Sequence, residues 1–132
     1  MTPVPCPRCE APTVAFAVPA SLREHVDGAS AASICTDCLL LEPLDDTDGS
    51  GALEPVEFDP LPFPDGEGGA AAALAVGLLD SLALNRPAIE ACIEYAERDG
   101  VDVFLALDRL AEADVNPPFD PARRKAQLEN LL

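Results

Sequence analysis

Apolar and polar residues alternate in the first third of the chain and take on a helical spacing in its second half. Residues 14–18 place a large apolar side chain at every second position, which predicts a half-buried β-strand. Residues 21–24 read Ser-Leu-Arg-Glu, the pattern of a helix-capping box, and Gly28 is expected to end that short helix. A second strand is predicted across residues 35–41.

The C-terminal half predicts helices. Residues 70–84 are apolar on nearly every side, which indicates a helix that is either covered within the chain or meets a second molecule; we expect coverage within the chain. Asn85 is expected to cap a second helix and Gly100 to end it, while Asp102 caps a third and Asp120 precedes a fourth. The predicted inward faces are Ile89, Cys92, Ile93 and Ala96 in the second helix, and Val103, Leu107, Leu110 and Ala111 in the third. Ala73 and Gly77 are spaced so that another helix could approach the first one closely.

A segment of different composition separates the two halves. Residues 45–68 hold 8 acidic and no basic side chains, interrupted by prolines and glycines, which excludes a helix and is typical of a linker. Residues 45–51 are expected to be mobile. Residues 53–63 contain regularly placed apolar side chains and are expected to form an extended arm on an apolar surface, with a fully solvated tether as the alternative.

The charge balance narrows the classes of partner. The chain has 24 acidic and 8 basic side chains, a net charge of -16, whereas proteins that bind phosphate backbones carry basic surfaces. We therefore expect neither nucleic acid nor an anionic membrane as a partner. The longest apolar run, residues 68–79, is shorter than the ~20 residues that a bilayer requires. The N-terminus also lacks the pattern of a signal peptide, so we expect a cytoplasmic protein.

The acidic excess also indicates the environment. Only Lys125 is a lysine among the 8 basic residues. This balance is typical of proteins from salt-in halophiles, because molar salt screens repulsion between carboxylates within a few ångströms. An acidic protein from an ordinary cytosol is the alternative interpretation.

Four cysteines form the strongest chemical pattern in the sequence. Cys6 and Cys9 make one Cys-x-x-Cys pair, and Cys35 and Cys38 make a second, with 25 residues between the pairs. A two-residue gap lets one tight turn direct two thiolates at the same ion, and two such turns complete a tetrahedron. We therefore predict one structural Zn²⁺ with these four ligands. An iron site, disulfides or a redox pair are weaker alternatives.

These turns resemble the knuckles of the zinc-ribbon family, which are typically written Cys-Pro-x-Cys-Gly. The resemblance covers residues 6–44, and Glu10 and Leu39 stand where the family often has glycine. With its acidic composition, the whole chain resembles small haloarchaeal zinc-ribbon proteins of unknown function. The resemblance implies the ligand role of Cys6, Cys9, Cys35 and Cys38. The residue patterns, taken together, predict an α+β fold, with a zinc-ribbon-like β module at residues 1–44, the linker at 45–68, and three to four helices at 69–132.

The remaining reactive side chains favour structural roles. Cys92 lies on the apolar stripe of the second helix and is expected in the core. His25 is expected at the surface, far along the chain from Cys92, so the two do not indicate a catalytic pair. The basic cluster at residues 123–125 is expected to pair with carboxylates of this same chain, with docking of an acidic partner as the alternative.

Together these observations predict a zinc-binding structural or interaction module that contacts a protein partner, with no enzymatic activity. The alternative function is a regulator that associates with transcription or translation machinery through its zinc ribbon. A homodimer is left open, since the apolar helix at residues 70–84 has more hydrophobic surface than one packed face needs.

Overall fold

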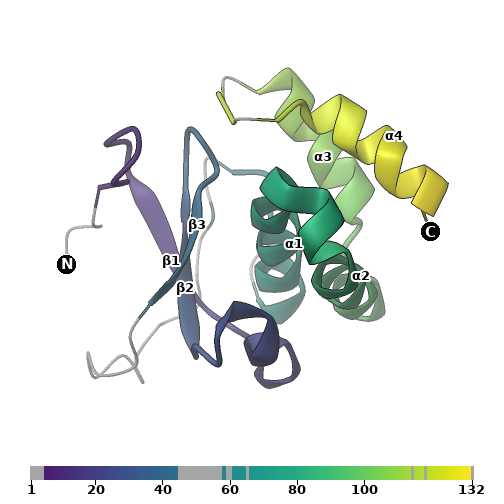
Figure 1. The fold of residues 1–132 in the computed structure, drawn as a ribbon, viewed down its shortest axis with the longest axis horizontal. Coiled ribbons are helices and arrows are strands. Elements are labelled where there is room, and N and C mark those ends of the chain that lie inside the picture. Colours follow the sequence, from purple (N-terminus) through teal and green to yellow (C-terminus); the bar gives the residue numbers. More distant parts are fainter. Residues whose placement is uncertain are drawn as a thin grey trace.

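The computed structural model describes residues 5–44, 58, 61–64, 66–113, 115–117 and 119–131. As predicted, the fold is α+β: an N-terminal three-stranded antiparallel sheet is followed by four α-helices, which lie on one side of the sheet (Figure 1). The strands are β1 (Thr13–Ala17), β2 (Ala31–Cys35) and β3 (Leu41–Leu44), and the α-helices are α1 (Glu67–Leu78), α2 (Leu82–Arg98), α3 (Val103–Glu112) and α4 (Pro121–Leu131).

The strands pair in sequence order, with β2 in the centre. Val14 and Leu41 both lie opposite Ile34, so the apolar positions of the three strands are in register. The period-two pattern of β1 is confirmed, because Phe16 and Val18 are buried while the alanines beside them are exposed.

The second strand prediction is wrong in its extent. β2 ends at Cys35 and β3 begins at Leu41, and residues 36–38 form a turn between them. The second cysteine pair therefore sits in the β2–β3 connection, because the two thiols of a Cys-x-x-Cys unit converge only when the backbone turns.

The β1–β2 connection is a 3₁₀ helix, η1 (Ala20–Val26), and its predicted cap is wrong. Pro19 occupies the N-cap position and no side chain caps the helix, so residues 21–24 do not form a capping box. The chain leaves η1 through Asp27, whose φ of 58° is left-handed, and then through Gly28.

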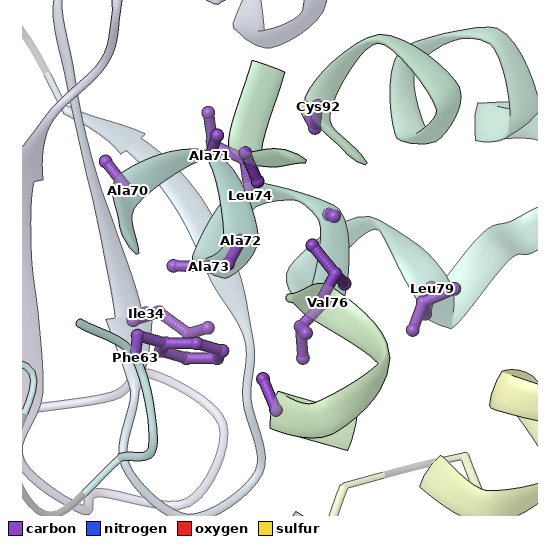
Figure 2. Close-up of a cluster of buried hydrophobic side chains, with 14 of the residues drawn as sticks. Ile34, Phe63, Ala70, Ala71, Ala72, Ala73, Leu74, Val76, Leu79 and Cys92 are labelled. Carbon is purple, nitrogen blue, oxygen red and sulfur yellow. The ribbon is translucent and has the colours of Figure 1, made fainter. Parts of the chain in front are cut away.

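Helix α1 is the central element of the core. Every residue from 68 to 76 is buried, which confirms coverage within the chain for this part of the predicted helix. Figure 2 shows Ala70 and Ala73 on the side of α1 that faces the strands, with Leu74 on the side toward Cys92 of α2. The small side chains on the strand side let the sheet approach the α1 backbone closely.

The predicted helix over residues 70–84 is interrupted. α1 ends at Leu78, and the 3₁₀ turn η4 (Leu79–Ser81) leads directly into α2. Leu84 is 84% exposed, so the apolar segment leaves the core at this break. Asn85 lies inside the first turns of α2 and does not cap it; its Nδ2 donates to the Leu78 carbonyl at 3.1 Å, across the break.

The packed faces of α2 and α3 contain the predicted residues, except that one buried alanine of α3 differs from the predicted one. All four predicted core residues of α2 are buried. In α3, Ala106 is buried and Ala111 is exposed, because the short helix turns its last residues toward solvent. Asp102 caps α3 as predicted, since its Oδ1 accepts from the Leu105 N–H at 3.1 Å.

The close approach predicted at Gly77 involves a strand, whereas a helix was expected. A Cβ at Gly77 would lie 2.6 Å from the Cβ of Leu41 in β3. The absence of a side chain at Gly77 is therefore what lets the end of α1 rest on the edge of the sheet.

The packing of the arm predicted at residues 53–63 is confirmed where it is described, but its extended conformation is not, since the Leu61 N–H donates to the Phe58 carbonyl at 2.7 Å and closes a turn. Phe58, Leu61 and Phe63 are all buried, and the Phe58 ring packs against Phe16 of β1 and against Phe63, with centroids 5.5 and 5.6 Å apart. Residues 45–57 lie outside the described part of the chain, so mobility at 45–51 stays a prediction. One hydrophobic cluster joins the sheet, the arm and the helices.

Within the described residues, one helical stretch is long and apolar enough to cross a membrane by length and composition alone. It runs over Glu67–Arg98, through α1, η4 and α2, with a mean hydropathy of 1.4 in its most apolar window. Of that window, 61% is buried inside the molecule, and core helices pass the same test. We interpret the stretch as the packed core hairpin just described.

Candidate metal centre

The two Cys-x-x-Cys turns have the same backbone geometry. In each, the N–H of the first cysteine donates to the carbonyl five residues later: Cys6 to Ala11 at 2.9 Å, and Cys35 to Leu40 at 3.0 Å. Each turn is thus a closed loop that starts at its first cysteine and presents both thiols on one side.

Backbone amides in both turns also point at the sulfurs. The Arg8 N–H lies 3.4 Å from the Cys6 Sγ, and the Asp37 N–H lies 3.3 Å from the Cys35 Sγ. Such N–H···S contacts stabilise negative charge on a sulfur, which is the form that binds a metal.

The position after each pair is left-handed even though it is not glycine. Glu10 has φ 65° and Leu39 has φ 61°, the conformation for which the zinc-ribbon pattern usually supplies glycine. Each left-handed non-glycine residue costs about 1–3 kcal/mol of backbone strain. Leu39 offsets this with a side chain that is 2% exposed within the main core, and Glu10 donates its N–H to the Cys6 carbonyl at 2.8 Å.

The four thiols lie together. The Cys6 and Cys38 Sγ atoms are 3.6 Å apart, those of Cys9 and Cys35 are 3.3 Å apart, and all four lie within 4.8 Å of one another. A regular tetrahedron with metal–sulfur bonds of about 2.3 Å has sulfur–sulfur edges of about 3.8 Å. The recorded separations are near that value and far longer than the ~2 Å of a disulfide. All five cysteines are free.

Three of the four thiols are buried, and burial disfavours the thiolate form of Cys35. Cys6, Cys35 and Cys38 are buried and Cys9 is exposed. Desolvation raises the pKa of the Cys35 thiol to about 12, against the lowering effect of the Asp37 and Cys38 amides. A set of four thiolate sulfurs suits a soft or borderline ion such as Zn²⁺. The donor set therefore fits a structural metal, and its four ligands close a tetrahedral sphere.

Polar contacts connect both cysteine turns to the helical part of the chain. In the second turn, Asp37 accepts two hydrogen bonds from Asn116 in the α3–α4 connection, one on its carbonyl at 2.9 Å and one on its Oδ1 at 3.0 Å. In the first turn, Arg8 donates to the Cys38 carbonyl at 3.3 Å and lies 3.9 Å from Asp80 in η4. The metal centre is therefore the junction between the sheet and the helical part.

Comparison with known proteins gives a family without an assigned activity. Residues 5–132 match the Family of unknown function (DUF6276). The chain belongs to DUF6276. No similar protein was found among curated proteins, and none among solved structures. Since the match spans both halves of the molecule, the cysteine turns and the helices belong together in DUF6276.

Two other candidates of the sequence lie apart from the cysteine cluster in this DUF6276 protein. Cys92 is completely buried, which raises the pKa of its thiol to about 12 and confirms it as a core residue. His25 is half-buried on η1, where its Nε2 lies 3.9 Å from a Glu24 carboxylate oxygen. The described cluster of potential metal ligands does not include His25.

The basic cluster of α4 pairs within the chain only in part. Lys125 forms an ion pair with Asp108 of α3 at 2.9 Å, as predicted. Arg124 instead binds neutral groups: its Nε donates to the Leu79 carbonyl at 3.0 Å and its Nη1 to Gln127 Oε1 at 2.7 Å. Among the described residues of α3 and α4, no side chain accepts a hydrogen bond from the Arg123 guanidinium.

Sequence reasoning missed the residues that connect the centre to the rest of this DUF6276 fold. Asn116 meets Asp37 across 79 residues, and Asp80 meets Arg8 between elements that no local periodicity relates. The Thr36 hydroxyl similarly donates to the Pro12 carbonyl at 2.7 Å, and holds the second turn against the start of β1. Only the polar character of the tip residue Asp37 hinted at such a role.

Proposed function

We propose that the chain is a zinc-stapled interaction module that works through protein contacts, with no catalytic step, in the cytoplasm of a halophile. One Zn²⁺ on Cys6, Cys9, Cys35 and Cys38 would hold the sheet against the helices. Four thiolates fill a tetrahedral sphere and leave no position for a substrate or an activated water, which supports a structural role for the metal.

The observation that carries this proposal is the attachment of the metal centre to the helical part. Asn116 and Asp80, from two different helical connections, bind the tips of the two cysteine turns. Loss of the metal would release both tips, so the ion would determine the relative placement of the sheet and the helices. A module of this kind presents one rigid surface to a partner.

The arginines near the cysteine turns support a protein partner over a nucleic acid. Arg8 is engaged by the Cys38 carbonyl and Asp80, and the Arg23 Nε donates to the Val18 carbonyl at 3.1 Å. Both guanidinium groups of the ribbon are thus used inside the chain, whereas phosphate binding requires a set of available cations. A regulator attached to transcription or translation machinery remains the alternative, and it would reach that machinery through a protein subunit.

The net charge of -16 supports the halophilic setting. Self-repulsion at this charge density destabilises a folded chain in dilute buffer and is screened in molar salt, where the Debye length is about 3 Å. The proposal therefore ties folding, metal binding and partner binding to high ionic strength.

The test is a purification and pull-down in 2 M KCl with the tagged full chain. We expect one zinc per chain by mass spectrometry of the metal content, a protein that co-purifies reproducibly, and a melting temperature that rises from 0.1 to 2 M KCl. A chain that is folded without metal would contradict the proposed structural role of zinc. Recovery of nucleic acid in place of protein would overturn the partner class, and a melting temperature that falls with salt would overturn the halophilic setting.

A further inference from the structure

A groove runs between the first turns of α2 and helix α4. It has a volume of about 520 Å³, and its lining includes Leu82 and Arg86 from α2 and Arg124, Gln127 and Leu131 from α4. None of these residues takes part in the metal centre. The groove is therefore a separate feature of the surface.

Arg124 is the unusual group in this groove. It is half-buried, and its two hydrogen bonds go to the Leu79 carbonyl and the Gln127 amide oxygen, which are both neutral. In the part of the chain that the structure describes, no carboxylate forms an ion pair with it, although the chain has 24 acidic side chains. A guanidinium has five N–H donors, so two bonds fix its orientation and leave donors for a further acceptor.

The charge around Arg124 is positive in an otherwise acidic molecule. Helix α4 has Arg123, Arg124 and Lys125 against the single acid Glu129, and within the described residues only Lys125 of the three cations forms an ion pair, with Asp108 of α3. A second hollow of about 370 Å³ adjoins the groove, and Arg123 and Arg124 both line it. Asp120 also lines this hollow, but its Oδ1 accepts from the Ala122 N–H at 3.0 Å and the Arg123 N–H at 3.3 Å, which holds it at the start of α4.

The opposite wall contributes a second guanidinium and apolar surface. The Arg86 side chain is 51% exposed and pairs with Glu90 at 3.0 Å, one turn further along α2. The apolar lining consists of Leu82 and Ala83 from α2, together with Leu131 of α4, which is 37% exposed. The groove thus combines an oriented cation, a second exposed cation and an apolar surface to which Leu82 and the partly exposed Leu131 contribute.

We propose that this groove docks an acidic peptide segment of the protein partner, with a carboxylate on Arg124 and an aliphatic side chain between Leu82 and Leu131. This inference rests on the proposed function and names the surface and the chemistry of the partner. Charge complementarity identifies the occupant: a planar guanidinium with free N–H groups matches a carboxylate in a bidentate manner, and the leucines match an apolar anchor. A nucleic acid would leave those leucines uncovered and would meet the repulsion of the remaining chain.

The experiment uses the zinc-loaded full chain in 1 M KCl, where only direct contacts persist. The probes are three pools of acetylated and amidated 12-residue peptides, composed of Leu with Glu, Leu with Lys, or Ser with Glu, and a 12-nucleotide oligothymidine. Binding is measured by fluorescence anisotropy, and ¹H–¹⁵N spectra locate the contact through the Arg124 Nε–Hε signal and the amides of α2 and α4. We expect the Leu/Glu pool to bind best and to shift these signals.

The variants separate the charge from the fold. Arg124→Gln is expected to weaken binding of the Leu/Glu pool at least 10-fold, and Arg124→Lys, which keeps the charge, to retain part of it. Because Arg124 also holds Leu79, Arg86→Gln serves as a second variant on an exposed side chain and is expected to weaken binding about 3-fold. Arg98→Gln, at the far end of α2, makes the same charge change outside the groove and should leave binding unchanged.

Each other outcome overturns the inference. The inference fails if the folded chain does not bind the Leu/Glu pool, or if the Arg124→Gln and Arg86→Gln variants bind that pool as tightly as the unmodified protein does. It also fails if the chain prefers the Leu/Lys pool or oligothymidine. The fate of the proposed function is read separately. If the Arg124→Gln variant holds zinc and retains its natural protein partner as well as the unmodified chain does, the groove is not the docking site, but the proposed function as an interaction module stands.

Discussion

Asn116 binds Asp37 through both its backbone and its side chain, across 79 residues of sequence. Asp37 is the third residue of the second Cys-x-x-Cys turn, and Asn116 lies in the connection from α3 to α4. A paired contact of this kind fixes both the position and the orientation of the connection. The metal centre and the C-terminal helices are therefore expected to gain and lose order together.

The first prediction concerns this contact. Asn116→Ala removes the Nδ2 bond to Asp37 and keeps the backbone bond, so we expect the free energy of unfolding to fall by about 0.5–1 kcal/mol in the zinc-loaded protein. Denaturant titration in molar KCl measures the change. The same substitution should have no effect after zinc is removed, and Asn130→Ala on the exposed face of α4 should have none in either state. An equal loss with and without zinc would contradict the coupling.

The second prediction concerns the ligands. Cys35→Ser should lower the affinity for metal and weaken the thiolate-to-metal charge-transfer absorption of the cobalt-substituted protein, because it removes one of four thiolates. Hydrogen exchange should then increase in the cysteine turns and also at Val115 and Asn116. Cys92→Ser is the matched control: it changes a buried core thiol, lowers stability and leaves one metal per chain. Unchanged protection in the α3–α4 connection would show that the metal stabilises the sheet but not this connection.

The sequence was informative where chemistry is local. The spacing of Cys6, Cys9, Cys35 and Cys38 identified the four thiols that the structure brings together, because a two-residue gap permits few backbone conformations. The stripe through Ile89 and Cys92 likewise identified the packed face of α2, since 3.6-residue periodicity survives in most tertiary contexts.

The break at η4 could not be predicted in the same way. Neither glycine nor proline marks residues 79–81, and the nearest proline, Pro87, lies inside α2. The chain turns there because Leu79 must stay in the core while Leu84 does not, and Asn85 then binds the free Leu78 carbonyl. Tertiary packing thus overrides the local signal, as it does for the left-handed Leu39, whose side chain is held in the core.

The third prediction compares two apolar residues that the sequence placed in one continuous helix. Val76→Asp buries a carboxylate without a partner at a fully buried site in α1 and should lower the free energy of unfolding by about 3 kcal/mol or more. Leu84→Asp, at a site 84% exposed, should change it by less than about 0.5 kcal/mol. Circular dichroism melts in 2 M KCl measure both. Comparable losses in the two variants would place Leu84 in a packed interface.

The fourth prediction uses the only tyrosine of the chain. Tyr95 in α2 donates its hydroxyl proton to Glu67 Oε2 at 2.6 Å, next to the bond that Gly68 N–H makes to Asp99 at 2.9 Å. The hydrogen bond to the Glu67 carboxylate, with partial burial and the nearby negative charges, raises the pKa of Tyr95 from 10.0 to about 12. Together these bonds hold the first turn of α1 against the last turn of α2.

The sign of the pH dependence follows from that shift. The unfolded chain loses the tyrosine proton near pH 10 and the folded chain near pH 12, so the contribution of Tyr95 to stability is complete below pH 10 and disappears as the pH rises to about 12. With one tyrosine and no tryptophan, absorbance at 295 nm reports this ionisation directly. Glu67→Gln should return the pKa of Tyr95 toward 10, and Tyr95→Phe should remove this part of the alkaline loss of stability. If Tyr95 of the folded protein titrated at the same pH as in urea, the bond between α1 and α2 would be absent in solution.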